Sequence, residues 1–190
     1  MPYRRVPFFA GGYYHIYNRG NNQQAIFFER ENYVFFLRQL RKYFVRTAVD
    51  IVAYCLMPNH YHLLIHLKID DLASLVQPFA LSYTKAINKR LHRVGTLFQG
   101  PFKAILIERE EYLLELSRYI HLNPVKAALV ARAEEWEFSS YRDYIGLRNG
   151  SLVAPEVVLA YFPSRQAYRE FIESAQEDWQ LLQRLGLDAE

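Results

Sequence analysis

The sequence contains a single cysteine, Cys55, among its 190 residues. One cysteine excludes an intrachain disulfide and any zinc site built on several thiolates, so we expect a reducing compartment, the cytoplasm. No stretch approaches the ~18–20 consecutive apolar residues of a membrane helix. The N-terminus lacks the long apolar region of a secretory signal, so none is expected. No internal repeat or low-complexity segment stands out, and the chain is therefore expected to fold as an ordinary globular domain.

Positive charge is concentrated in the first part of the chain. Residues 1–107 contain 14 Lys and Arg against 5 Asp and Glu, whereas residues 108–190 contain 9 against 15. Aromatic residues make up 16% of the chain, with 15 Tyr and 13 Phe. A basic, aromatic-rich segment is typical of a nucleic-acid surface, because cations neutralise phosphates and aromatic rings stack on bases. A merely solvated basic face explains the charge equally well.

Hydrophobic periodicity predicts four strands and three helices. The strands are expected at 13–17, 49–57, 60–67 and 102–107, and the helices over about 29–46, from 70–71 past residue 87, and from about 108 to 123. The first six elements match the ferredoxin-like β-α-β-β-α-β order. The expected fold class is α+β: an antiparallel sheet with helices, a further helix, and a C-terminal helical appendage. We expect one domain over 1–190, with its core at about 10–130 and the appendage at about 131–190, which has a helical pattern near 167–185.

Turn and proline signals set the expected ends of these elements. The cluster at 18–22 predicts a turn after the first strand, and Asp70 or Asp71 can cap the second helix. Pro78 should kink that helix or shorten its start. The third helix should end around Asn123-Pro124, because proline disfavours a helical residue before it, which leaves 125–130 as a short helix or turn.

Two histidines share one face of the strand predicted at 60–67. His60 and His62 lie ~6–7 Å apart at the backbone, so their nitrogens form half of a metal site. Incidental surface or core histidines explain most pairs of this kind. His66 points to the same face but lies ~13 Å further along, so we do not expect it to share an ion. The other histidines, which have no evident partner, are assigned structural roles: His15, His92 and His121.

Tyr119 and Asn123 lie four residues apart and therefore on one face of the predicted third helix. Core packing on the stripe with Tyr112 and Leu116 is the simplest interpretation of Tyr119. If this helix packs on the histidine face of the sheet, a phenol, an amide oxygen and two imidazoles converge. A phenol with a pKa near ~10 is a poor nucleophile at neutral pH, so a divalent ion or a base would have to assist its attack.

Two motifs resemble those of a known enzyme family. Residues 57–65, MPNHYHLLI, resemble the His-hydrophobic-His motif of the HUH single-strand DNA endonucleases, with tyrosine at the middle position, and within these the single-tyrosine transposases. Residues 118–127, RYIHLNPVKA, resemble that family's catalytic-tyrosine motif. Residues 95–100, GTLFQG, and 136–141, WEFSSY, resemble segments of the REP-associated tyrosine transposases, which act on repetitive extragenic palindromes in bacteria. The resemblance covers roughly 10–145, with the motifs in family order.

The resemblance implies cleavage of single-stranded DNA through a covalent 5′-phosphotyrosine. Tyr119 would be the nucleophile, and His60, His62 and Asn123 would bind a divalent metal. Such a donor set suits Mg²⁺ or Mn²⁺, although imidazole also suits zinc. The partner would be a palindromic DNA hairpin with a single-stranded flank, in the bacterial cytoplasm and at the nucleoid. Oligomeric state, monomer or homodimer, stays open.

Several cations are candidate DNA contacts. They lie near the first strand and along the second helix: Arg4, Arg5, Arg19, Lys85, Lys89, Arg90 and Arg93. Each is equally compatible with a solvated cation. Two rival functions also stay open: a non-catalytic ferredoxin-like nucleic-acid-binding protein, and a metal-dependent hydrolase that uses activated water. A covalent adduct on Tyr119 would exclude the first, and release of a free 5′-phosphate without an adduct would favour the second.

Overall fold

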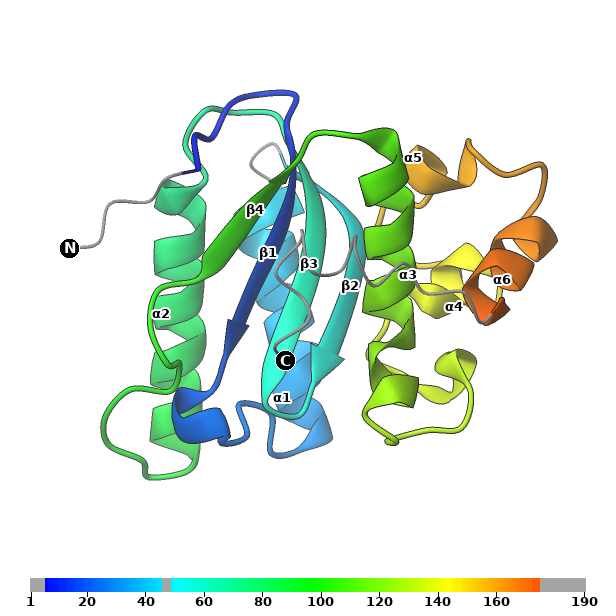
Figure 1. Cartoon of the computed structure of the whole chain (residues 1–190). Coiled ribbons are helices and arrows are strands. Elements are labelled where there is room, and N and C mark those ends of the chain that lie inside the picture. The colour runs from blue at the N-terminus through cyan, green and yellow to red at the C-terminus, as the bar shows by residue number, and fades with distance from the viewer. Residues whose placement is uncertain (1–5, 46–48, 175–190) are drawn as a thin grey trace.

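The computed structural model describes residues 6–45 and 49–174, and within them a four-stranded antiparallel sheet flanked by helices (Figure 1). The strands are β1 (Tyr13–Arg19), β2 (Val49–Met57), β3 (His60–Leu67) and β4 (Lys103–Ile107). The long helices are α1 (Arg30–Leu40), α2 (Ala73–Arg90) and α3 (Glu110–Lys126), and the short ones are α4 (Tyr141–Tyr144), α5 (Glu156–Leu159) and α6 (Arg165–Glu173). Short 3₁₀ turns lie at Asn21–Gln23 and Ala133–Glu135, and a π-helical turn at Arg41–Val45 extends α1.

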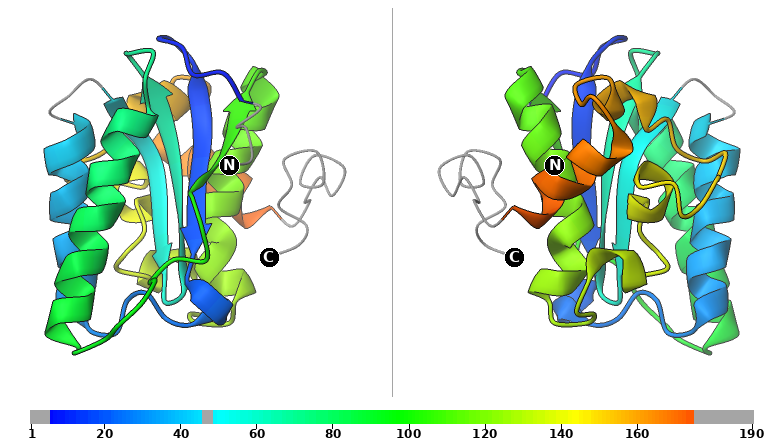
Figure 2. Two further views of the ribbon diagram at one scale, coloured as in Figure 1. Left: turned by 90° about the vertical axis from the view of Figure 1, so that its left-hand side faces the viewer. Right: turned by 90° about the vertical axis from the view of Figure 1, so that its right-hand side faces the viewer.

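The strand order β2-β3-β1-β4 confirms the predicted α+β fold. Helices α1 and α2 cover one face of the sheet, and α3 with the C-terminal helices covers the other (Figures 1 and 2). Each face therefore has its own hydrophobic core. Both faces of β3 are consequently covered: Tyr61, Leu63, Ile65 and Leu67 pack toward α1 and α2, while Leu64 packs toward α3.

The predicted ends of three elements need correction. Strand β1 continues through Asn18 and Arg19, which were expected in a turn, because these residues pair with Tyr61 and His60 of β3. The helix predicted over 29–46 is α1 followed by the π-helical turn. Helix α2 begins at Ala73 and contains Pro78 in its second turn, so the proline does not shorten its start. The N-cap of α2 is Leu72 and not Asp70 or Asp71, although the Asp71 carboxylate accepts a hydrogen bond from the Ser74 amide at 3.1 Å.

The prediction that α3 ends around Asn123-Pro124 was also wrong. The helix contains Pro124 and continues to Lys126. Proline removes its own amide donor and its ring crowds the carbonyl four residues earlier, yet the carbonyls of Asn123 and Pro124 accept hydrogen bonds from Ala127 and Leu129, each at 3.0 Å. Asn123 therefore keeps a helical conformation one turn after Tyr119.

The C-terminal helices are fastened to α3 by a buried hydrogen-bond network around His121. Its ring nitrogens lie 2.7 Å from the Tyr168 hydroxyl and 2.8 Å from the Ser140 hydroxyl. The Ser140 hydroxyl also accepts a hydrogen bond from the Tyr54 amide of β2 at 2.9 Å. Complete burial lowers the pKa of His121 to about 3, so its imidazole is neutral at pH 7. The structural role of His121 is therefore to link α3 to α6 and, through Ser140, to β2.

Three expectations fall wholly or partly outside the described residues. They are Arg4, Arg5 and the helical pattern near 167–185, of which the part after residue 174 lies outside and α6 is the described part. Within the described ranges, no helix is long and apolar enough to cross a membrane.

Candidate functional site

The structure brings His60, His62, Tyr119 and Asn123 together at one end of the interface between the sheet and α3. The Nε2 atom of His60 lies 3.2 Å from the side-chain oxygen of Asn123. The Nε2 atom of His62 lies 3.5 Å from the side-chain nitrogen of the same residue. Strand alternation places both imidazoles on the face that α3 covers, and the helical repeat places Asn123 one turn beyond Tyr119.

Tyr119 lies directly against His62. The two rings meet edge to face, with centroids 5.4 Å apart. The tyrosine is largely buried, with 6% of its surface exposed. Lys126, two turns further along α3, places its ammonium 4.9 Å from the centre of the Tyr119 ring. The sequence interpretation did not single out Lys126, although its spacing of seven residues from Tyr119 predicts that the two share a helix face.

The hydrogen bonds of His60 leave its Nε2 lone pair facing Asn123. Asn59 donates its side-chain amide to the Gln23 carbonyl at 3.3 Å, which turns its side-chain oxygen toward Nδ1 of His60 at 2.7 Å. Nδ1 must then carry the proton of the neutral ring, so Nε2 is an acceptor. Two acceptors, Nε2 of His60 and the oxygen of Asn123, thus face each other at 3.2 Å.

His62 is fixed in the same way by a residue that the sequence analysis treated as structural. Nδ1 of His62 lies 3.0 Å from Nε2 of His15, and both residues are fully buried. If Nδ1 of His62 donates this bond, its Nε2 also presents a lone pair toward Asn123. The two histidines come from strands β1 and β3, paired so that Tyr17 lies opposite His62 and His15 lies opposite Leu64. This diagonal contact depends on strand register, which the sequence does not display.

The donor set fits a divalent cation. Nε2 of His60 faces the amide oxygen of Asn123 at 3.2 Å, whereas Nε2 of His62 faces its amide nitrogen at 3.5 Å. Two imidazole nitrogens and an amide oxygen are donor types that suit a divalent cation. Within the described ranges, no cluster of three or more His, Cys, Asp or Glu could hold a metal ion. Asn123 is the side-chain oxygen that the structure places beside the two imidazoles.

The remaining histidines lie away from this group. Nδ1 of His66 lies 3.6 Å from the Asp50 carboxylate, and the His66 ring stacks on Tyr13 at the far end of β3. His92 is exposed in the loop after α2. His121 faces the C-terminal helices. All three therefore lie apart from His60, His62, Tyr119 and Asn123.

The candidate DNA contacts on α2 lie on the opposite face of the sheet from α3. Lys85, Lys89 and Arg90 of α2 are exposed, and Arg93, in the loop after α2, is half-buried. Arg90 forms an ion pair with Glu29 at 3.0 Å. The C-terminal end of α2 and the β2–β3 turn nevertheless lie at the same end of the molecule, shown at the bottom of Figure 1. Arg19 ends β1 there and donates to the side chain of Gln99 at 2.5 Å.

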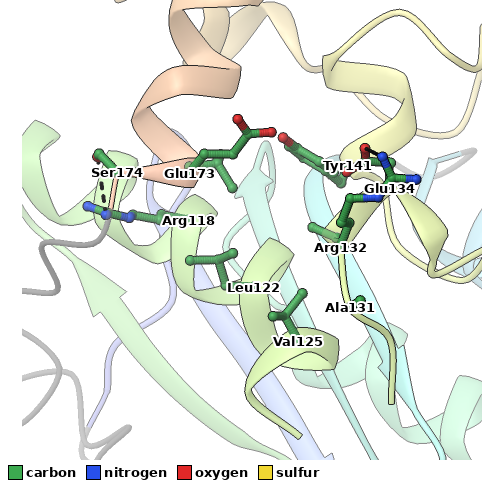
Figure 3. A pocket seen from close by; sticks show the side chains of 11 residues that line it. Arg118, Leu122, Val125, Ala131, Arg132, Glu134, Tyr141, Glu173 and Ser174 are labelled. Atoms are coloured by element: carbon green, nitrogen blue, oxygen red, sulfur yellow. Dashed lines mark hydrogen bonds and ion pairs between the residues drawn. The ribbon is translucent and has the colours of Figure 1, made fainter. Parts of the chain in front are cut away.

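A separate cavity of about 580 Å³ lies between α3, the 3₁₀ turn Ala133–Glu135 and the end of α6 (Figure 3). Arg118, Leu122 and Val125 of α3 form one side, and Glu134 and Tyr141 lie opposite. None of the four convergent residues, His60, His62, Tyr119 and Asn123, lines this cavity. It belongs to the junction with the C-terminal helices and not to the histidine site.

Comparison with known proteins agrees with this geometry. The family described as Transposase IS200 like matches residues 9–123. A protein of Haemophilus influenzae named as a REP-associated tyrosine transposase is 30% identical over 103 residues, which cover 48% of this chain and 58% of that protein. The match thus spans somewhat more than half the length of that curated relative.

The fold also has a solved counterpart. A REP-associated tyrosine transposase, solved bound to a REP hairpin, superposes with a TM-score of 0.65. The match covers 77% of this chain and 86% of that one, at 22% sequence identity. This likeness confirms the arrangement of sheet and helices. The matched family segment begins before β1 and ends at Asn123, so it includes both histidines and the tyrosine of the site. The chain therefore belongs to the IS200-like transposase family.

Proposed function

We propose that this protein cleaves single-stranded DNA and transfers the cut strand, with Tyr119 as the nucleophile. The observation that carries the proposal is the convergence of His60, His62 and Asn123 beside the Tyr119 ring. Family membership supports the same activity, and the related structure was solved with a REP hairpin. A DNA hairpin with a single-stranded flank is therefore the proposed substrate.

His60, His62 and Asn123 are the proposed ligands of a divalent cation, Mg²⁺ or Mn²⁺. When bound, such a cation polarises a phosphoryl group and stabilises negative charge on its oxygens. In this proposal, Asn59 and His15 each accept the Nδ1 proton of one imidazole, which directs the two Nε2 lone pairs at the site. The ammonium of Lys126 adds positive charge where the scissile phosphate approaches the Tyr119 ring.

In the proposed reaction, the phenolic oxygen of Tyr119 attacks the scissile phosphorus and forms a 5′-phosphotyrosine. The bond from phosphorus to the 3′ oxygen breaks, the phenol gives up its proton, and the departing 3′ oxygen takes up a proton. Attack by another 3′-hydroxyl on the phosphotyrosine reverses these steps and joins strands. Each ester bond that breaks is replaced by another, so the reaction needs no ATP.

The test is incubation with end-labelled DNA and Mn²⁺, followed by a denaturing gel. We expect a hairpin with a single-stranded flank to yield a protein–DNA adduct, whereas a fully paired duplex of the same sequence yields none. The reason is that in-line attack needs an accessible phosphate, and bases are recognised most easily when unstacked. Equal cutting of both substrates would contradict the single-strand proposal, and a free 5′-phosphate without adduct would favour hydrolysis by water.

A second prediction concerns His15, which we propose positions His62. His15→Phe should weaken Mn²⁺ binding by about 10- to 100-fold, because a partner that fixes a ligand's tautomer contributes to metal affinity. His15→Gln, whose side-chain oxygen can accept the Nδ1 proton, should restore part of the loss. The measurement is calorimetric titration of the DNA-free protein. His66→Phe, a change on the same sheet face at the far end of β3, is the matched control; an equal effect of both changes would refute the assignment.

A further inference from the structure

An exposed aromatic and cationic surface lies at the end of the sheet where β1 and the β2–β3 turn meet the loop after α2. Phe28 has 44% of its surface exposed, and Val94 has 99%. The guanidinium of Arg93 lies 5.3 Å from the centre of the Phe28 ring. We call Phe28, Arg93 and Val94 the end platform. Large exposed apolar side chains grouped with a cation are typical of an interaction surface.

Hydrogen bonds connect this platform to the β2–β3 turn that carries His60. The amide of Phe27, next to Phe28, donates to the Pro58 carbonyl at 3.0 Å. The amide of Gly20 donates to the Asn59 carbonyl at 2.7 Å. Asn59 in turn contacts the His60 ring. The platform and the histidine site are therefore held at the same end of the sheet, on its two sides.

The platform is built on a well-supported backbone. Arg90 pairs with Glu29 at 3.0 Å, which fastens the end of α2 to the segment of Phe28. The side-chain amide of Asn88 donates a hydrogen bond to the Gly95 carbonyl at 2.9 Å. The backbone carbonyl of Asn88 accepts one from the Arg93 amide, also at 2.9 Å. These bonds close the loop that presents Val94. Its exposure is thus a property of a fixed turn, and a rigid surface loses little entropy when a partner binds.

Arg93 has hydrogen-bonding capacity left over. Its Nη1 atom is buried, and among the described residues it has no hydrogen-bond partner. A buried donor without an acceptor costs free energy, so a rotation of the Arg93 guanidinium that brings Nη1 to an anionic oxygen of a ligand would be favourable. The neighbouring cations Lys89 and Arg90 are exposed, so the surroundings favour a negatively charged partner.

We propose that the end platform binds the single-stranded flank of the DNA, with an unpaired base stacked on Phe28 and a backbone phosphate at Arg93. This inference rests on the proposed function. Aromatic rings stack on any base, and arginine adds a cation–π and phosphate contact, so such a surface fits single-stranded nucleic acid. A protein partner or a second copy of this chain would need an apolar area larger than two side chains within a basic border.

The test compares Phe28→Ala with Phe9→Ala, since Phe9 is also 44% exposed but lies at the far end of β1, beside Tyr14. Affinity is measured by fluorescence anisotropy for a hairpin with a single-stranded flank and for the same hairpin without it. Phe28→Ala should weaken binding of the flanked hairpin by at least about fivefold, leaving the unflanked hairpin unaffected. Phe28→Trp should retain binding, and Phe9→Ala should change neither affinity.

Abasic substitutions in the flank locate the stacked base. In the wild-type protein, removing one base should weaken binding about as much as Phe28→Ala does, and combining the two changes should cause no further loss. Equal affinities of Phe28→Ala and Phe9→Ala for the flanked hairpin would overturn the platform. A Phe28-dependent change in sedimentation mass without DNA would assign it to self-association instead. Formation of the Tyr119 adduct is measured separately. Failure of the platform proposal would therefore not decide whether Tyr119 is the nucleophile.

Discussion

Tyr119→Phe should abolish the covalent protein–DNA adduct and lower the cleavage rate by at least about 10³-fold, the scale of losing a nucleophile. The change removes only the phenolic oxygen and keeps the ring that packs edge to face on His62. Folding should therefore persist, with a loss of about 1 kcal/mol for one hydrogen bond. Hairpin affinity should also persist, because positive surface charge supplies much of DNA binding. The adduct is measured on a denaturing gel.

Tyr112 provides the matched control for this change. It lies seven residues before Tyr119 on α3, two turns away. The Arg109 guanidinium lies 5.6 Å from the centre of the Tyr112 ring. Tyr112→Phe should cleave at the wild-type rate. Mass spectrometry of the wild-type adduct should place the nucleotide on the peptide that contains Tyr119. A nucleotide on Tyr112, Tyr61 or another residue would refute the assignment even if cleavage itself is observed.

Loss of either histidine should have the second-largest effect. His60→Ala or His62→Ala should reduce cleavage by at least about 100-fold, since charge stabilisation by the cation is worth several kcal/mol. Mn²⁺ affinity of the DNA-free protein should fall in parallel, and hairpin binding should change little. His60→Ala is easier to interpret than His62→Ala, because His60 is only half-buried and its loss disturbs the core less. His62 is fully buried, and its loss also removes the hydrogen-bond partner of His15.

The readouts of the histidine variants separate a metal role from a structural one. Thermal unfolding identifies any variant that loses activity through loss of stability. His66→Ala is the control on the same sheet face. Wild-type cleavage by His60→Ala at limiting Mn²⁺ would exclude His60 as a ligand. Restoration of its cleavage at high Mn²⁺ would support a ligand role.

The fold was largely predictable because local patterns agree with tertiary packing. The alternation at 60–67 identifies which side chains share a face, and helical spacing places Asn123 beside Tyr119. These two periodicities account for the convergent group once α3 is known to cover the histidine face. The sequence could not show that both faces of β3 are covered, since alternation alone does not distinguish a buried imidazole such as His62 from an exposed one.

The features that were missed depend on contacts between distant residues. His15 acquires its role only through the register of β1 against β3. Proline statistics predicted the end of α3 one turn too early, because the lost bond is a single one near the end of a packed helix. The exposure of Phe28 and Val94 was missed as well, because it depends on loop geometry that the sequence does not show.

The buried bonds of His121 restrict how this protein can be recombined with its relatives. Residue 121 lies between Tyr119 and Asn123, so the turn of α3 that carries the proposed chemistry on one side is anchored to Ser140 and Tyr168 on the other. A chimaera that takes α3 from this protein without the segment up to Tyr168 would leave the buried, neutral imidazole of His121 without the hydroxyls of Ser140 and Tyr168. The interchangeable unit is therefore α3 together with residues 133–172, and not the tyrosine helix by itself.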